Sequence, residues 1–151
     1  MEKKRGKKIF LLRHADYLSG VGVENPGLSS YGEKQAKSLS DKIKANLNGD
    51  DENITIWTSS ANRAKETALI IKENFPNAEF IENEKLWSDN KHLPDFNWLE
   101  QELKSFYGNT LIIISHLEYI QDFPATIGFS ESDADYAEGV LIENDKCVDF
   151  G

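Results

Sequence analysis

Cysteine is almost absent from this sequence, and long apolar segments are absent altogether. Cys147 is the only cysteine among 151 residues, which excludes an internal disulfide and fits a reducing compartment. The first eight residues are basic, but only four apolar residues separate them from Arg13, too few for a signal-peptide core of about 7–15 residues. No run approaches the ~18 apolar residues of a membrane span. We therefore expect a cytoplasmic protein without membrane association, whose residues 1–8 form a flexible lead-in.

Positive charge is also scarce. The chain has 17 lysines and arginines against 26 aspartates and glutamates, a net charge of −9, which argues against binding to nucleic acid or anionic membranes. Any cationic site must therefore be built locally. The length fits one domain, residues 1–151, which buries roughly 68–70% of the surface of its unfolded chain.

What the sequence does contain is an alternation of short apolar runs and amphipathic segments. Helical spacing follows the Ser30-x-x-Glu33 capping-box pattern and the Ser59-Ser60 pair. Strands are predicted at 9–12, 54–57, 79–81 and 111–114, helices at 30–47, 61–75, 96–106 and 120–127, and a terminal hairpin at 140–142 and 147–150. The pattern predicts an α/β fold with a mostly parallel central sheet and helices on both faces.

Polar residues that suit an anion follow three of the predicted strands. The first strand runs into Arg13-His14, the second is followed by Arg63 in the first turn of a helix, and the fourth ends in Ser115-His116. Ligands of open α/β sheets bind beyond the carboxyl ends of the strands. Parallel strands bring these ends to one edge, so we expect these residues to share one pocket.

Such a group of side chains suits a phosphoryl group. Two guanidiniums can hold its oxygens by charge-assisted hydrogen bonds, and the helix N-termini add N–H donors. Two histidines can supply a nucleophilic ring nitrogen and a second donor. Each residue alone is weak support, because an Arg-His pair or a histidine after a strand is common. Their shared position is what favours a site, with His14 as the nucleophile.

The residues that carry this hypothesis also resemble a known family. Phe10–Ala15 is similar to the R-H-G signature of the histidine phosphatase (phosphoglycerate mutase-like) superfamily, and Thr58–Ala68 to its S-x-x-x-R-A-x-x-T-A segment. Leu28–Ala36 resembles the L-T-x-x-G-x-x-Q-A segment, and Ile112–His116 the strand with the second histidine. The matches occur in the order of the family and span residues 9–116.

This resemblance implies a three-layer αβα sandwich and a two-step phosphoryl transfer that uses no metal and no cofactor. His14 would attack phosphorus, Arg13, Arg63 and His116 would hold the phosphoryl oxygens, and water would discharge the phosphohistidine. The short chain is most similar to the branch that includes SixA-type phosphohistidine phosphatases.

Two positions depart from the family pattern. Ala15 stands where the family has glycine, and Ser88 of Leu86-Trp87-Ser88 stands where an L-x-E glutamate is the usual proton donor. Asp89 is the candidate replacement acid, ahead of Glu84. Because a phosphoramidate leaving group needs less acid help than an alkoxide, the missing glutamate favours phosphohistidine as substrate.

Two further residues are candidates for substrate binding. Asp16 follows the signature and could rim the pocket, and Asn25 could contact phosphate, although Asn25-Pro26-Gly27 is as good a turn. No cluster of His, Cys or Asp has metal-ligand spacing.

We expect a phosphatase that acts on a phosphorylated protein, with protein phosphohistidine slightly preferred, or on a small phosphorylated metabolite. One alternative is a phosphoglycerate mutase-type enzyme or sugar-phosphate phosphatase. The other is a catalytically weak module that binds phosphate or phosphoprotein.

Overall fold

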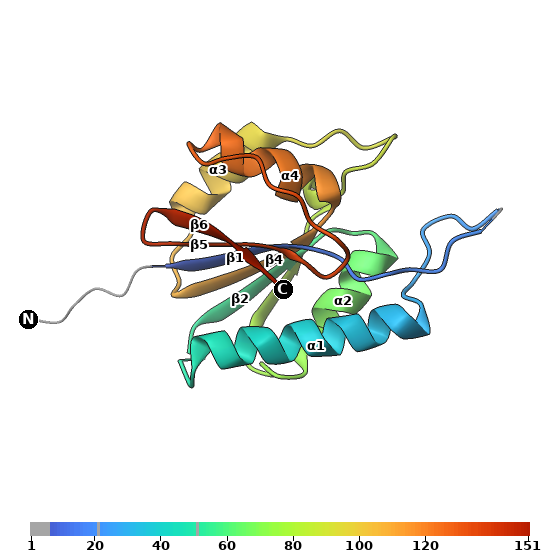
Figure 1. Cartoon of the computed structure of the whole chain (residues 1–151), viewed down its shortest axis with the longest axis horizontal. Helices are drawn as coiled ribbons and strands as arrows, with labels where there is room; N and C mark the ends of the chain where they lie inside the picture. Colours follow the sequence, from blue (N-terminus) through green and yellow to red (C-terminus); the bar gives the residue numbers. More distant parts are fainter. Residues whose placement is uncertain (1–6, 21, 51) are drawn as a thin grey trace, which may run out of the picture.

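The computed structural model describes residues 7–20, 22–50 and 52–151, and its centre is a six-stranded sheet between two pairs of helices (Figure 1). In chain order, the elements are β1 (Lys8–Arg13), α1 (Ser30–Leu47), β2 (Ile54–Thr58), α2 (Asn62–Lys72), β3 (Glu79–Glu82), the short 3-10 helix η1 (Glu84–Leu86), α3 (Phe96–Ser105), β4 (Thr110–Ser115), α4 (Leu117–Thr126), β5 (Gly139–Glu143) and β6 (Lys146–Phe150).

The sheet has the order β3-β2-β4-β1-β5-β6. The strands β3, β2, β4 and β1 pair in parallel, whereas β5 pairs antiparallel with β1 and β6 antiparallel with β5. Helices α1 and α2 cover one face and α3 and α4 the other (Figure 1). The predicted αβα sandwich with a mostly parallel sheet is confirmed.

The two central strands feed two separate cores, because successive side chains of a strand point to opposite faces. Phe10 and Leu12 of β1 pack in the core beneath α1 and α2. Leu11, between them, packs in the core beneath α3 and α4. In β4, Ile112 and Ile114 belong to the first core and Leu111 and Ile113 to the second. A continuous apolar run is therefore the sequence expected of these strands.

Helix α1 begins at Ser30 as predicted, but its N-cap and the start of α4 differ from the sequence prediction. The N-cap of α1 is Ser29 rather than Ser30, and its hydroxyl accepts a hydrogen bond from the Gly32 N–H at 3.0 Å. Gly32 is required there, because a Cβ would lie 1.9 Å from the carbonyl oxygen of Asp16. Helix α4 begins directly after His116, earlier than predicted, and Pro124 lies within it.

The last residue of the predicted basic lead-in belongs to the sheet. Residues 1–6 of the lead-in lie outside the described residues, but Lys8 is the first residue of β1. Its Nζ contacts Glu143 at 3.8 Å and Asn46 Oδ1 at 3.1 Å, so Lys8 is part of the sheet rather than of a flexible segment. No helix in the described part of the chain is both long and apolar enough to cross a membrane.

Candidate active site

The four residues predicted from the strand ends line one pocket of about 380 Å³. Arg13 and His14 leave the carboxyl end of β1, and His116 leaves that of β4. Arg63 stands in the first turn of α2, which follows β2. The parallel register explains the convergence, since Arg13 is paired with Ser115, and Thr58 with Ile114. The structure thus brings together residues that lie about 50 positions apart in the chain.

His14 presents one ring nitrogen to the pocket. Its Nδ1 lies 2.9 Å from the carbonyl oxygen of Ala15, so Nδ1 carries the proton and donates it there. Nε2 is left with its lone pair and accepts a hydrogen bond from Arg63 Nε at 3.3 Å. Burial, with the Arg63 and Arg13 guanidiniums nearby, lowers the pKa of His14 to about 3. The imidazole is therefore neutral near pH 7, as a nucleophile requires.

His116 stands beside His14, with ring centroids 5.1 Å apart. Its Nε2 lies 2.8 Å from Ser59 Oγ, and its Nδ1 lies 3.4 Å from an Arg63 terminal nitrogen. Ser59 Oγ also accepts a hydrogen bond from the Ala61 N–H at 3.1 Å. Burial, and then the neighbouring His14 and Arg63, lower the pKa of His116 to about 2. Ser59 thus fixes the orientation of a neutral second histidine.

Three aromatic side chains surround the two guanidiniums. Arg13 lies over the Tyr136 ring at 4.1 Å, while Arg63 lies 5.1 Å from the Tyr17 ring and 5.9 Å from the Trp87 ring. Arg13 also donates a hydrogen bond to the carbonyl oxygen of Ala134 at 3.0 Å. These contacts hold the two planar cations in fixed positions.

The Ala15 backbone is compatible with a side chain. Ala15 is not among the described residues that have left-handed backbone, so a side chain is accepted at this position. Its methyl group is fully buried in the core against α1 and α2. Its N–H donates to Thr67 Oγ1 at 3.0 Å, and the Thr67 hydroxyl donates to the carbonyl oxygen of Arg63 at 2.8 Å. Thr67 therefore connects the segment that follows His14 to the helix that carries Arg63.

Asp89 lines the pocket, but its carboxylate is occupied by its own loop. It accepts hydrogen bonds from Trp87 Nε1 at 2.9 Å and from the backbone N–H groups of Lys91 and His92 at 2.8 Å, and it pairs with His92 Nδ1 at 2.8 Å. Burial alone would raise the pKa of Asp89, but these bonds, led by that of the His92 side chain, hold it at about 2. An aspartate that is ionised throughout the physiological range is a poor proton donor, which weighs against the predicted acid role.

The structure does not place Asp16 and Asn25 among the residues that line the pocket. Asp16 Oδ2 accepts a hydrogen bond from Ser29 Oγ at 2.6 Å, which joins it to the start of α1. Asn25 Oδ1 accepts from the Asn62 N–H at 2.7 Å and so caps α2. Both side chains therefore have partners within the protein, and their contacts with substrate stay a prediction.

Two residues that were not predicted as site residues, Glu118 and Ser88, also line the pocket. Glu118, in the first turn of α4, borders the pocket close enough to act on the Arg63 charge. It follows His116 by two residues, and from the sequence we expected its carboxylate to point away from a bound phosphate. Ser88 is 1% exposed and also lines the pocket. Only its place in the L-x-E position indicated its location.

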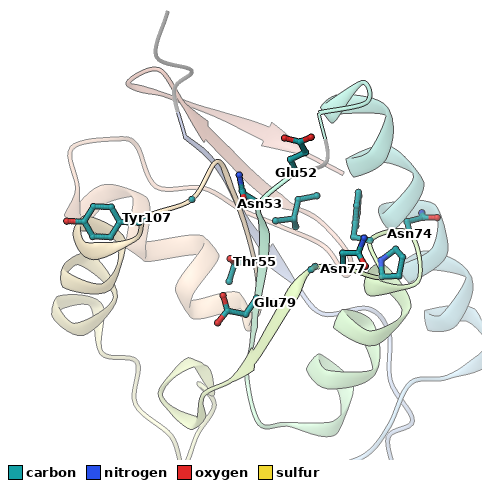
Figure 2. Close-up of a pocket in the computed structure, with 12 residues that line it drawn as sticks. Glu52, Asn53, Thr55, Asn74, Asn77, Glu79 and Tyr107 are labelled. Carbon is teal, nitrogen blue, oxygen red and sulfur yellow. The ribbon is translucent and has the colours of Figure 1, made fainter. Parts of the chain in front are cut away.

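A larger depression, of about 830 Å³, lies at the opposite end of β2 (Figure 2). Its polar side chains include Glu52, Asn53, Asn77 and Glu79, and Tyr107 stands at its border. None of the described residues that line it is a lysine, arginine or histidine, so it offers no charge for a phosphoryl anion. Residues 7–20, 22–50 and 52–151 contain no grouping of three or more His, Cys, Asp or Glu side chains that could hold a metal.

Residues 9–87 match the family model of the histidine phosphatase superfamily (branch 1). The chain belongs to this family. The resemblance expected from the Arg13-His14 segment is therefore confirmed, and with it membership of a family of phosphatases and mutases. No curated protein matches the sequence.

Solved structures of the family share the fold at low sequence identity. The protein histidine phosphatase SixA, complexed with tungstate, is 16% identical with a TM-score of 0.75, over 94% of this chain and 93% of that one. A candidate SixA phosphohistidine phosphatase from Agrobacterium tumefaciens is 15% identical with a TM-score of 0.75, over 95% and 97% of the two chains. Phosphoglycerate mutase from Plasmodium falciparum is 24% identical with a TM-score of 0.62, over 98% and 91%. At these identities the comparisons establish the fold alone.

Proposed function

We propose that this protein is a phosphatase that forms a phosphohistidine on His14 and acts preferentially on protein phosphohistidine. The observation that carries the proposal is the pair of His14 Nε2 and Arg63 Nε, 3.3 Å apart in the pocket. A neutral imidazole nitrogen is aimed at the place where a guanidinium would hold a phosphoryl oxygen.

The reaction has two steps. His14 Nε2 attacks phosphorus, the bond from phosphorus to the leaving group breaks, and the leaving group departs with the electron pair and takes up a proton. Water then attacks phosphorus, the P–Nε2 bond breaks, and inorganic phosphate is released with His14 restored to its neutral form. Arg13 and Arg63 compensate the charge on the phosphoryl oxygens in both steps. With the Ser59 hydroxyl donating to Nε2, His116 carries its proton on Nδ1 and is a neutral donor for the same oxygens.

The proton balance of the pocket favours a phosphoramidate substrate. Asp89 has a pKa of about 2 and holds no proton to give. An imidazole leaving group titrates near neutral pH, so its ring can collect a proton from solvent, whereas an alkoxide needs one as it departs. The SixA protein that shares this fold is named a protein histidine phosphatase, which agrees with this preference.

The charge of the lining also argues against a substrate with two acidic groups. The described lining residues include two guanidiniums, Arg13 and Arg63, and two carboxylates, Asp89 and Glu118. One phosphoryl group can use both arginines. A second phosphate or a carboxylate, as on a phosphoglycerate, would find no further cation and would meet repulsion.

A small phosphomonoester is the second candidate, and Glu118 is the observation that favours it. Its carboxyl group borders the pocket and could protonate an alkoxide as the latter departs. In that case a Glu118→Gln variant would lose turnover of alkyl phosphates while retaining turnover of a phosphohistidine peptide.

The decisive experiment is rapid-quench labelling with a peptide that carries labelled phosphohistidine. We expect acid-labile label on His14, released as phosphate within the turnover time. His14→Ala should abolish both label and turnover, whereas His92→Ala, which removes an exposed histidine, should retain the label on His14. Label that persists in His14→Ala would exclude His14 as the nucleophile. Faster turnover of sugar phosphates than of the peptide would favour the second candidate.

A further inference from the structure

Two buried polar atoms of the pocket residues have no hydrogen-bond partner in the part of the chain that the structure describes. They are Ser88 Oγ and Arg13 Nε, and both residues line the same pocket as His14. Buried polar groups in proteins are nearly always hydrogen-bonded. Two unpartnered polar atoms on residues of the same pocket indicate that a bound ligand supplies their hydrogen-bond partners. For Arg13 Nε, a phosphoryl oxygen is a suitable acceptor.

The backbone on both sides of Ser88 is held in place by other contacts. Ser115 Oγ, at the end of β4, donates a hydrogen bond to the carbonyl oxygen of Leu86 at 2.6 Å. The Asp89 N–H donates to the carbonyl oxygen of His92 at 2.9 Å, and the Trp87 indole donates to the Asp89 carboxylate. The serine is thereby fixed at the pocket, and its hydroxyl is left without a competing partner.

The Asp89 side chain, next to Ser88, cannot donate a hydrogen bond as the Ser88 hydroxyl can. The Asp89 oxygens are taken up by the Trp87 indole and by the 91–92 turn, and an ionised carboxylate can only accept hydrogen bonds. A hydroxyl can donate to a phosphoryl oxygen, but it does not release a proton near neutral pH. At this position the pocket therefore has a hydrogen-bond donor that is not an acid.

We propose that Ser88 is a specificity-determining residue, whose hydroxyl donates a hydrogen bond to the transferring phosphoryl group and limits the enzyme to phosphoramidates. This inference rests on the proposed function. In the first step the P–Nε2 bond to His14 forms and the P–N bond of the substrate breaks, with its electron pair staying on the departing nitrogen. The ring leaves as neutral imidazole, because its other nitrogen has taken up a proton from solvent. An alkyl phosphate, whose oxygen needs a proton from an acid at this position, is a poor substrate for that reason.

Affinity for an oxyanion tests the hydrogen bond. Ser88→Ala should weaken the binding of orthovanadate about tenfold, as expected for loss of a hydrogen bond to a charged group. Ser38→Ala, which removes an exposed hydroxyl on α1, should leave the affinity unchanged. Equal vanadate affinity in wild type and Ser88→Ala would overturn the proposed contact, and this measurement decides the matter if larger side chains at position 88 prevent folding.

The preference for phosphohistidine over phosphoserine tests whether Ser88 determines the substrate class. One peptide sequence is made with phosphohistidine and with phosphoserine, and kcat/KM is measured for wild type, Ser88→Glu and Ser88→Gln. The ratio for phosphoserine over phosphohistidine should rise at least tenfold in Ser88→Glu, since a general acid contributes about 10²–10⁴. Ser88→Gln, of similar size but without an acidic proton, should not show this rise. An equal ratio in wild type and a folded Ser88→Glu would overturn the specificity role.

Failure of this inference is distinct from failure of the proposed function. If wild type neither labels His14 nor releases phosphate, the proposed function is wrong whatever Ser88 does. If wild type labels His14 and hydrolyses the phosphohistidine peptide, but the Ser88 variants keep its vanadate affinity and substrate ratio, only the role of Ser88 is wrong.

Discussion

His116 Nε2 and Ser59 Oγ lie 2.8 Å apart, and the same hydroxyl oxygen accepts the Ala61 N–H at the start of α2. One serine thus connects the end of β4 to the helix that carries Arg63. Because Ser59 Oγ pairs with Nε2, the other ring nitrogen of His116, Nδ1, faces the Arg63 guanidinium.

We expect Ser59→Ala to lower kcat about tenfold or more, while KM changes less. The variant removes the contact that orients His116 but leaves Arg13 and Arg63 to bind the phosphoryl group. Steady-state kinetics on a phosphohistidine peptide measures the two parameters. Ser59→Thr retains the hydroxyl and should recover part of the loss. A rise in KM alone, with kcat unchanged, would place Ser59 in substrate binding instead.

Asp89→Asn should reduce kcat/KM less than tenfold. A general acid contributes about 10²–10⁴, but Asp89 has a pKa of about 2 and its oxygens support the 88–92 loop. Asparagine keeps an oxygen for the N–H groups of Lys91 and His92, so the loop should survive. The check is the pH profile of kcat/KM for both proteins, and a loss of 10²-fold or more would restore Asp89 as the acid.

Asn25→Ala should lower stability by about 0.5–2 kcal/mol, because it removes a side-chain oxygen that satisfies an N–H group at the start of α2. The left-handed backbone of Asn25 adds to the loss, since alanine adopts it less readily. The side chain accepts a hydrogen bond from Asn62 N–H at 2.7 Å. Urea unfolding measures the loss, and orthovanadate affinity of the folded protein should stay within about twofold of wild type. Strong loss of vanadate affinity without loss of stability would support the substrate contact expected from the sequence.

Stability should fall as the pH drops below 6.5. Burial holds the pKa of His14 near 3 and that of His116 near 2, both below the usual value of 6.5. As the pH falls through 6.5, the unfolded chain takes up these protons while the native state does not, so the free energy of unfolding decreases until about pH 3. Each histidine contributes a slope of about 1.4 kcal/mol per pH unit.

Urea unfolding between pH 4 and 8 measures this effect, and His14→Ala isolates one contribution. The variant should lose stability less steeply than wild type below pH 6. Parallel curves for the two proteins would show that His14 titrates normally in the native state.

The ends of the strands could be predicted from sequence because they depend on local pattern. The apolar runs 9–12 and 111–114 stop at charged or titratable residues, and parallel pairing forces such ends to one edge. Arg13, His14, Arg63 and His116 follow from that rule, and the family segments around them agree. The positions of the helices follow in the same way from the spacing of their buried residues.

Loop conformation could not be predicted, and it decides what the remaining residues do. Asp16, Asn25 and Asp89 have the chemistry of ligands or acids in the sequence. In the structure their oxygens are bound to Ser29, Asn62 and the 91–92 turn. Each of these hydrogen bonds depends on where a loop lies after the sheet has formed, which no local pattern encodes.

The sequence by itself thus determined the sheet, the order of its elements and the four residues at its carboxyl edge. Only the tertiary structure decided which neighbours complete the site: Ser59 against His116, Glu118 at the border, and the unpaired hydroxyl of Ser88 in the lining. The physical reason is distance along the chain. Strand and helix patterns repeat within a few residues, whereas these contacts join segments about 30–60 residues apart.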